Sequence, residues 1–280
     1  MNKEPIESPE TPETPLIEPV PSLWTDRSRI WIVGLILMLM AGNIFFQVQA
    51  YIMGGGLILP VLAGQIFGVF IPLLVLSSRN RWNPVTDFDL GRVPWVIPAV
   101  AGVLALATLV PSSLLAELSM RIFPTDPERM AMFQNSLPRS GLGILLTFIT
   151  VVLVGPLGEE MVYRGLVHRL ASGFWGPLKA TVLASLIFAL VHAEPWLLLG
   201  LVAIGAALSF LYETTGSLLA CWIFHAIHNA VALVMMYSAD EVQTEPSALT
   251  VQNFVWLGIS LLVWAVVGSW LLSLKKSRDE

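Results

Sequence analysis

The stretch GPLGEEMVYRG, residues 155–165, directly follows an apolar run, LGILLTFITVVLV, residues 142–154. Together they are long enough for a helix that crosses a bilayer, which needs about 20 mostly apolar residues. Two adjacent glutamates and an arginine, Glu159, Glu160 and Arg164, fall inside this span. Ionisable side chains are costly within a bilayer and usually mark a functional site. The stretch therefore predicts a membrane protein and the region where its chemistry occurs.

The rest of the chain has the same apolar character. Of its 280 residues, 55% are hydrophobic and only 12% are charged, with a mean hydropathy of +0.74. A soluble domain usually carries about 25% charged residues. The expected fold class is therefore all-α, a polytopic membrane protein of about eight transmembrane helices. The expected spans are 30–50, 57–77, 95–117, 142–172, 178–193, 196–213, 217–237 and 253–273.

The domain organisation expected from composition is simple. Residues 1–22 contain six prolines and five glutamates, cannot bury a core, and are expected to form a disordered cytoplasmic tail. Residues 23–280 form the membrane domain. The single cysteine, Cys221, excludes an intrachain disulfide.

The distribution of basic residues predicts the orientation in the membrane. Twelve of the 15 lysines and arginines fall in the N-terminal tail, the 78–94 loop, the 164–179 region and the C-terminal tail. Eight spans would put these four places on one side, and the positive-inside rule makes that side cytoplasmic. We expect a multi-pass protein of the plasma membrane with both termini in the cytoplasm. The sequence has no basic patch, so no nucleic-acid partner is expected.

Helical spacing sorts the polar residues within the spans. Glu160 and Arg164 are four residues apart and can pair along one face, which leaves Glu159 free. His225 and Asn229 have the same spacing and can face one cavity. A rise of 1.5 Å per residue puts them and His192 at similar depths, in a cavity expected to face the cytoplasm. This depth requires that the fourth helix continue past Pro156, where a kink is plausible.

These residue types suit hydrolysis of an amide. A carboxylate flanked by histidine can hold and deprotonate water, and histidine and asparagine can stabilise an oxyanion. Glu159, His192 and His225 are also a possible zinc ligand set, although the sequence has no HExxH motif. Two other interpretations remain at this point: a charge network that only fixes helix packing, and a transporter with a buried proton-relay carboxylate. For His168, the position near the cytoplasmic helix end favours an interfacial residue.

Three segments carry a family resemblance. EEMVYR at 159–164, FALVH at 188–192 and HAIHN at 225–229 resemble the EExxxR, FxxxH and HxxxN motifs of the CPBP family. This family comprises type II CAAX-prenyl endopeptidases and bacteriocin-processing, Abi-type membrane proteases. The three motifs occur in the family's order, and the resemblance covers about 142–237, where the catalytic core is expected.

The resemblance implies an intramembrane glutamic endopeptidase that acts on a membrane-protein, lipidated-protein or peptide substrate. The alternative is a non-catalytic membrane scaffold or a bacteriocin-immunity-type binding protein. No cofactor is implied, and zinc on Glu159, His192 and His225 is the alternative. The implied roles are water activation by Glu159 with His192, an oxyanion site from His225 and Asn229, and support from Glu160, Arg164 and Phe188.

Overall fold

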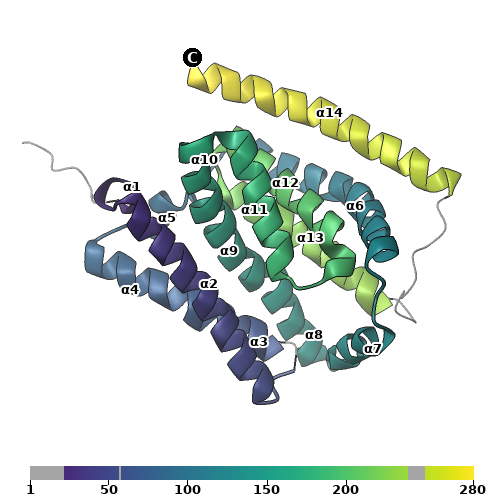
Figure 1. The fold of residues 1–280 in the computed structure, drawn as a ribbon. Coiled ribbons are helices and arrows are strands. Elements are labelled where there is room, and N and C mark those ends of the chain that lie inside the picture. The colour runs from purple at the N-terminus through teal and green to yellow at the C-terminus, as the bar shows by residue number, and fades with distance from the viewer. Residues whose placement is uncertain (1–21, 57, 239–249) are drawn as a thin grey trace, which may run out of the picture.

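The computed structural model describes residues 22–56, 58–238 and 250–280, and these residues form helices joined by short connections, with no strand among them (Figure 1). The predicted disordered tail, residues 1–22, lies outside this part of the chain except for Ser22. The all-α prediction is confirmed.

Along the described part of the chain, α-helices are interspersed with π-helical segments, η1 to η3, and a 3₁₀ turn, η4. The elements are α1 (Leu23–Asp26), α2 (Arg29–Ile52), α3 (Ile58–Ala63), η1 (Gly64–Phe70), α4 (Ile71–Asn80), α5 (Pro84–Asp87), α6 (Val96–Ile122), α7 (Pro127–Ser136), α8 (Gly141–Phe148), η2 (Ile149–Val154), α9 (Gly155–Glu160), η3 (Met161–His168), α10 (Arg169–Trp175), α11 (Pro177–Val191), η4 (Pro195–Leu197), α12 (Leu198–Thr215), α13 (Leu218–Ser238) and α14 (Val251–Asp279).

Each of the eight expected spans is a helix, but only seven of those in the described residues are long enough to cross a membrane. The exception is α11, whose 15 residues rise about 22 Å, less than the roughly 30 Å hydrocarbon core. Gly176, with φ 79°, and Pro177 set its start, and Ala193, with φ 53°, turns the chain just beyond its end. Because seven helices are long and apolar enough to cross a membrane, the protein is an integral, multi-pass membrane protein.

The fourth span is one uninterrupted helix, Gly141–Trp175, of 35 residues. It does not end at Gly158, because π-helical turns on either side of Pro156 carry the chain past the proline. Local π adjustments let a transmembrane helix continue past a proline, because they give freed backbone groups new partners. Glu159 and Glu160 therefore lie in the middle of a membrane-spanning helix.

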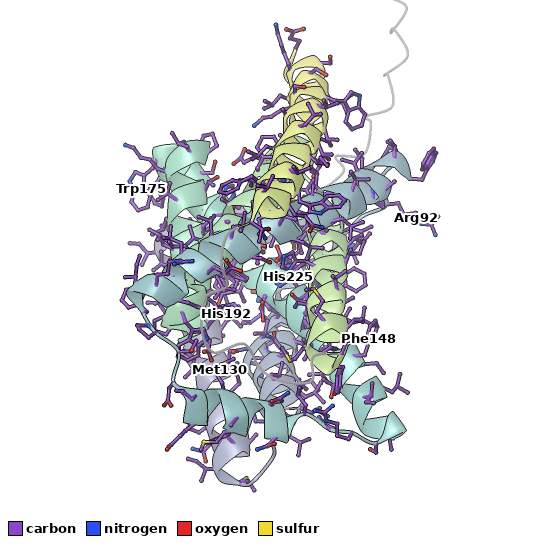
Figure 2. All side chains as sticks on the ribbon, turned by 90° about the vertical axis from the view of Figure 1, so that its right-hand side faces the viewer. Arg92, Met130, Phe148, Trp175, His192 and His225 are labelled. Carbon is purple, nitrogen blue, oxygen red and sulfur yellow. The ribbon has the colours of Figure 1, made fainter. Side chains whose placement is uncertain are left out.

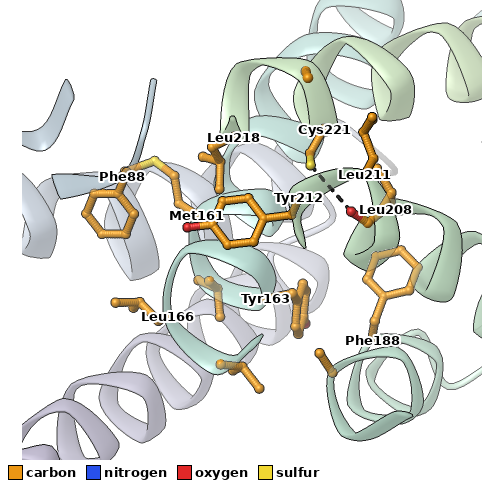
Figure 3. Packing of buried hydrophobic residues seen from close by; sticks show 14 of the residues in the cluster. Phe88, Met161, Tyr163, Leu166, Phe188, Leu208, Leu211, Tyr212, Leu218 and Cys221 are labelled. Carbon is orange, nitrogen blue, oxygen red and sulfur yellow. Dashed lines mark hydrogen bonds between the residues drawn. The ribbon is translucent and has the colours of Figure 1, made fainter. Parts of the chain in front are cut away.

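Close packing of α11, α12 and α13 builds the interior against this helix (Figure 3). A Cβ atom on Gly205 would lie only 2.9 Å from the Cα and Cβ of Ser185, so this glycine lets α12 approach α11 closely. Gly205 and Ser209 are both buried and form a small-xxx-small pair, which is typical of such a helix contact. In Figure 3, Phe188 and Tyr163 lie on facing helices of this core.

The described parts of the four basic regions gather at one end of the bundle (Figure 1). Trp24 Nε1 donates to the backbone oxygen of Asp87, and Arg169 pairs with Asp89 at 3.0 Å. Near the C-terminus, Lys275 pairs with Glu213 at 3.1 Å. Residues from α1, the 78–94 loop, α10 and α14 thus meet at this end, which we call the basic end.

Candidate active site

The four residues expected to be catalytic line one cavity of about 260 Å³. Glu159 comes from α9, His192 follows the end of α11, and His225 and Asn229 come from α13. Figure 2 shows His192 and His225 near one another at mid-height in the molecule. Tertiary packing thus brings together residues that are up to 70 positions apart in the sequence.

A fully buried ion pair lies beside the cavity. Arg164 Nη1 donates to Glu160 Oε1 at 2.9 Å, as the four-residue spacing predicts, and its Nη2 donates to the backbone oxygen of Gly205 at 3.1 Å. Both charged side chains have no exposed surface. Removing one partner of such a pair leaves an uncompensated buried charge, so the fold tolerates either charge only in the presence of the other.

His225 bridges the two glutamates. Its Nδ1 lies 2.7 Å from Glu160 Oε1, and its Nε2 lies 3.8 Å from Glu159 Oε2. Because Glu160 Oε1 also accepts from Arg164, it acts as a carboxylate acceptor, and Nδ1 of His225 is the donor. Nε2 is therefore the ring nitrogen that faces Glu159 and the cavity.

His192 is oriented by its own helix. Its Nδ1 lies 2.6 Å from the backbone oxygen of Phe188, and a carbonyl oxygen can only accept, so Nδ1 carries the proton. In the neutral ring, Nε2 is then free to accept a proton. Glu159 and His192 line the same cavity, and no contact joins them in the described structure, so a water molecule or a carbonyl group could lie between them.

The Phe188 ring lies at the centre of this arrangement and is 1% exposed. Its centroid is 4.6 Å from that of His192 and 5.7 Å from that of His225, both at steep interplanar angles. The Arg164 guanidinium lies 4.9 Å from the same ring. One aromatic ring therefore fixes the spacing of both histidines and the buried cation.

Asn229 is held by a carbonyl group that Pro156 leaves without a donor. In the π-helical turn, Gly155 N–H bonds to the oxygen five residues earlier, that of Thr150. The equivalent donor for Val151 would be residue 156, a proline, which has no N–H. Asn229 Nδ2 donates to that Val151 oxygen at 3.0 Å. Since an amide group has two hydrogens, the second is available to the cavity.

Two other contacts of this region were not predicted from the sequence. Trp222 Nε1 donates to the Leu153 oxygen at 2.9 Å, a second side-chain bond to the π-helical segment. Gln65 is 3% exposed and packs on Gly158, where a Cβ atom would overlap Gln65 Oε1. Pro156 inside a long apolar helix predicts the unpaired carbonyl of Val151, but it gives no indication of these two contacts.

His168 corrects an expectation. The sequence favours an interfacial residue, but the side chain has no exposed surface. Its Nε2 lies 3.4 Å from Thr181 Oγ1 and 3.7 Å from Glu213 Oε1. The helix extends to Trp175, one to two turns beyond His168, and α11 covers that face, so the residue is internal.

The zinc alternative requires Glu159, His192 and His225 to form one ligand cluster, and the described residues do not show such a cluster. No group of three or more His, Cys, Asp and Glu side chains among them could hold a metal ion. One nitrogen of His225 and one of His192 are already engaged with Glu160 and with a backbone oxygen, respectively.

In a comparison with family models, residues 141–231 match the type II CAAX prenyl endopeptidase Rce1-like family. The matched region contains all three motif segments and begins where the 35-residue helix begins. The resemblance inferred from the motifs is confirmed. No curated protein and no solved structure matches the chain.

Proposed function

Because residues 141–231 match the Rce1-like family of type II CAAX prenyl endopeptidases, we propose that the protein is an endopeptidase that hydrolyses a peptide bond within the membrane. The observation that carries the proposal is the shared cavity, which Glu159 and His192 both line without touching one another. This space lies among membrane-spanning helices, where ionisable groups are costly and usually mark a functional site.

Water activation is assigned to Glu159. Its side chain is 24% exposed, whereas Glu160 beside it is fully buried and already paired. Glu159 takes a proton from the bound water as the water oxygen attacks the carbonyl carbon of the substrate. His192 orients that water through Nε2. When the C–N bond breaks, the proton held by Glu159 passes to the departing amine, which returns the site to its starting state.

Stabilisation of the oxyanion is assigned to Asn229 and His225. The second amide hydrogen of Asn229 is fixed in direction because the first is bonded to Val151. His225 is assigned the second donor, from Nε2, which faces the cavity while Nδ1 donates to Glu160.

The cavity opens away from the basic end. Along α13 its lining extends from His225 to Met236, and along the 35-residue helix it extends from Glu159 back to Val151. Both directions lead from the basic end, which the positive-inside rule assigns to the cytoplasm. We therefore reverse the expectation of a cytoplasm-facing cavity: the substrate reaches Glu159 from the opposite side of the membrane.

Thiol labelling tests this sidedness. A cysteine at Met236 should react with a membrane-impermeant maleimide in intact cells, while a cysteine at Arg92 should react only after permeabilisation. The native Cys221 is fully buried and serves as the unlabelled background. The opposite labelling pattern would restore the cytoplasmic opening.

The proteolytic function is tested by mapping new N-termini in membranes from cells that express the wild type or Glu159→Gln at matched levels. We expect a loss of cleavage of about 10²- to 10⁴-fold, the range for removal of a general base. Glu280→Gln, a matched change at an exposed residue, should retain full cleavage. Cleavage that persists in folded Glu159→Gln would refute the mechanism, and identical termini with and without the protein would favour the scaffold or immunity alternative.

Metal dependence needs a separate measurement. The proposal predicts that activity survives strong chelation followed by removal of the chelator and its metal complex. If chelation abolishes activity and only zinc restores it, Glu159, His192 and His225 are zinc ligands and not the groups that activate water and stabilise the oxyanion.

A further inference from the structure

A second groove lies next to the catalytic cavity, at the end of the bundle far from the basic end. Its volume is about 440 Å³. It is lined by Ile144, Phe148, Leu233, Val234, Tyr237, Ser238 and Arg139. Leu233 also lines the catalytic cavity, so the two spaces adjoin on α13.

Arg139 is the charged residue of this groove. The side chain is exposed, and its guanidinium lies 5.9 Å from the ring of Tyr237, whose hydroxyl donates to the backbone oxygen of Pro138. No carboxylate among the described residues pairs with Arg139. The 35-residue helix also begins directly after Ser140, its N-cap, and a helix N-terminus carries partial positive charge. The outer end of an apolar groove therefore attracts an anion.

The distance from this anion-attracting end to the catalytic cavity can be counted along α13. Asn229 and Tyr237 are eight residues apart, which corresponds to about 12 Å of helix. An extended peptide covers that distance in about three to four residues, at roughly 3.3 Å each. A peptide bond placed at Asn229 would thus put a residue three to five positions away beside Arg139.

We infer that this groove binds the part of the substrate next to the scissile bond, and that Arg139 recognises a carboxylate three to five residues from that bond. The inference rests on the proposed proteolytic function and adds a specificity determinant to it. The carboxylate comes from an aspartate or glutamate side chain or from the C-terminus of the substrate, since the chemistry of recognition is the same.

The test uses the full-length protein in nanodiscs of phosphatidylcholine. The probes are apolar decapeptides in which one aspartate is moved position by position, each made with a C-terminal carboxylate or amide. We expect kcat/KM to be roughly tenfold higher when a carboxylate is three to five residues from the cleaved bond, because a charge-assisted hydrogen bond forms. Comparing the peptides that end in an amide with those that end in a carboxylate shows whether Arg139 recognises the aspartate side chain or the C-terminus.

Substitutions at Arg139 test whether this residue causes the positional preference for a carboxylate. Arg139→Gln should abolish it mainly through KM, Arg139→Lys should retain most of it, and Arg139→Glu should shift it toward lysine. Arg92→Gln, the same change at the basic end, should leave it intact. A positional preference that persists in Arg139→Gln, or no preference in the wild type, would overturn the inference.

Two further controls address competing anions. If neutralising Asp240, Glu241 and Glu245 removes the preference while Arg139 is intact, Arg139 pairs within the chain and the inference fails. If activity responds to phosphatidylglycerol in the nanodisc and not to the peptide carboxylate, Arg139 binds a lipid headgroup and the inference also fails. A preference unchanged by both controls supports it.

A binding measurement separates this inference from the proposed function. Benzoylphenylalanine at Val234 in the Glu159→Gln protein should crosslink the acidic peptides and not their neutral analogues, and Arg139→Gln should abolish the difference. If the acidic peptides crosslink in this Arg139-dependent way but the wild type cleaves none of them, the inference about the groove is supported and the proposed proteolytic function is rejected. If the wild type cleaves the peptides but no crosslinking is seen, the proteolytic function is supported and the inference about the groove is rejected.

Discussion

Two long apolar helices of this protein, the Gly141–Trp175 helix and α14, are nearly identical in hydropathy and differ in almost everything else. Their most apolar windows have mean hydropathies of 2.2 and 2.1, but 33% of the first is buried inside the protein and 17% of the second. The first carries two π-helical segments and a buried ion pair. Hydropathy therefore predicts which segments enter the membrane, and not which of them build the interior.

The difference arises from the polar groups that each helix must satisfy. α14 contacts the bundle through a few anchors: Trp264 Nε1 bonds to Thr108 Oγ1 at 3.2 Å, Leu271 is fully buried, and Lys275 pairs with Glu213. The interior helix needs partners from α12 and α13 for Arg164, Glu160 and two backbone carbonyls. Such groups cannot face lipid, so they force tight and specific packing.

The largest expected effect comes from breaking the interior ion pair. Arg164→Met leaves Glu160 as an uncompensated buried charge and should lower the free energy of unfolding by about 3–5 kcal/mol. The measurement is reversible unfolding in mixed micelles or by steric trapping. Lys276→Met in α14, whose side chain is 79% exposed, is the matched control and should change stability by less than about 1 kcal/mol. Equal effects from the two variants would contradict the comparison.

An intermediate effect is expected for Asn229→Ala, which removes an oxyanion donor. We expect kcat to fall about 10²- to 10³-fold with KM little changed, because the lost interaction forms in the transition state. Trp222→Phe removes the neighbouring bond to the Leu153 carbonyl and serves as the control. If Trp222→Phe lowers kcat as much, Asn229 acts through the π-helical backbone and not on the substrate.

The smallest effect is expected on the outer helix. Lys275→Gln breaks the partly exposed pair with Glu213 and should cost about 0.2–1 kcal/mol of stability, with kcat/KM unchanged. High salt should reduce the difference between this variant and the wild type, since the pair is screened. A loss of activity in Lys275→Gln would show that α14 is coupled to the catalytic cavity.

Part of the site could be predicted from local spacing. Glu160 and Arg164 are one helical turn apart, so their pairing needs only that the helix be continuous. The same holds for His225 and Asn229, which share a face of α13. The sidedness of the cavity could not be predicted this way, because it depends on which neighbouring helices leave space at Val151 and Met236.

Composition and periodicity by themselves determined that this chain is an all-helical membrane protein, since apolar content and backbone hydrogen bonding leave few other structures in lipid. The motif residues also determined the chemistry that the site could support. Only the tertiary structure decided that Asn229 completes the hydrogen bonding of Val151 and that His168 is internal. These outcomes depend on contacts between helices distant in sequence, where close packing and the need to pair every buried polar group select one arrangement.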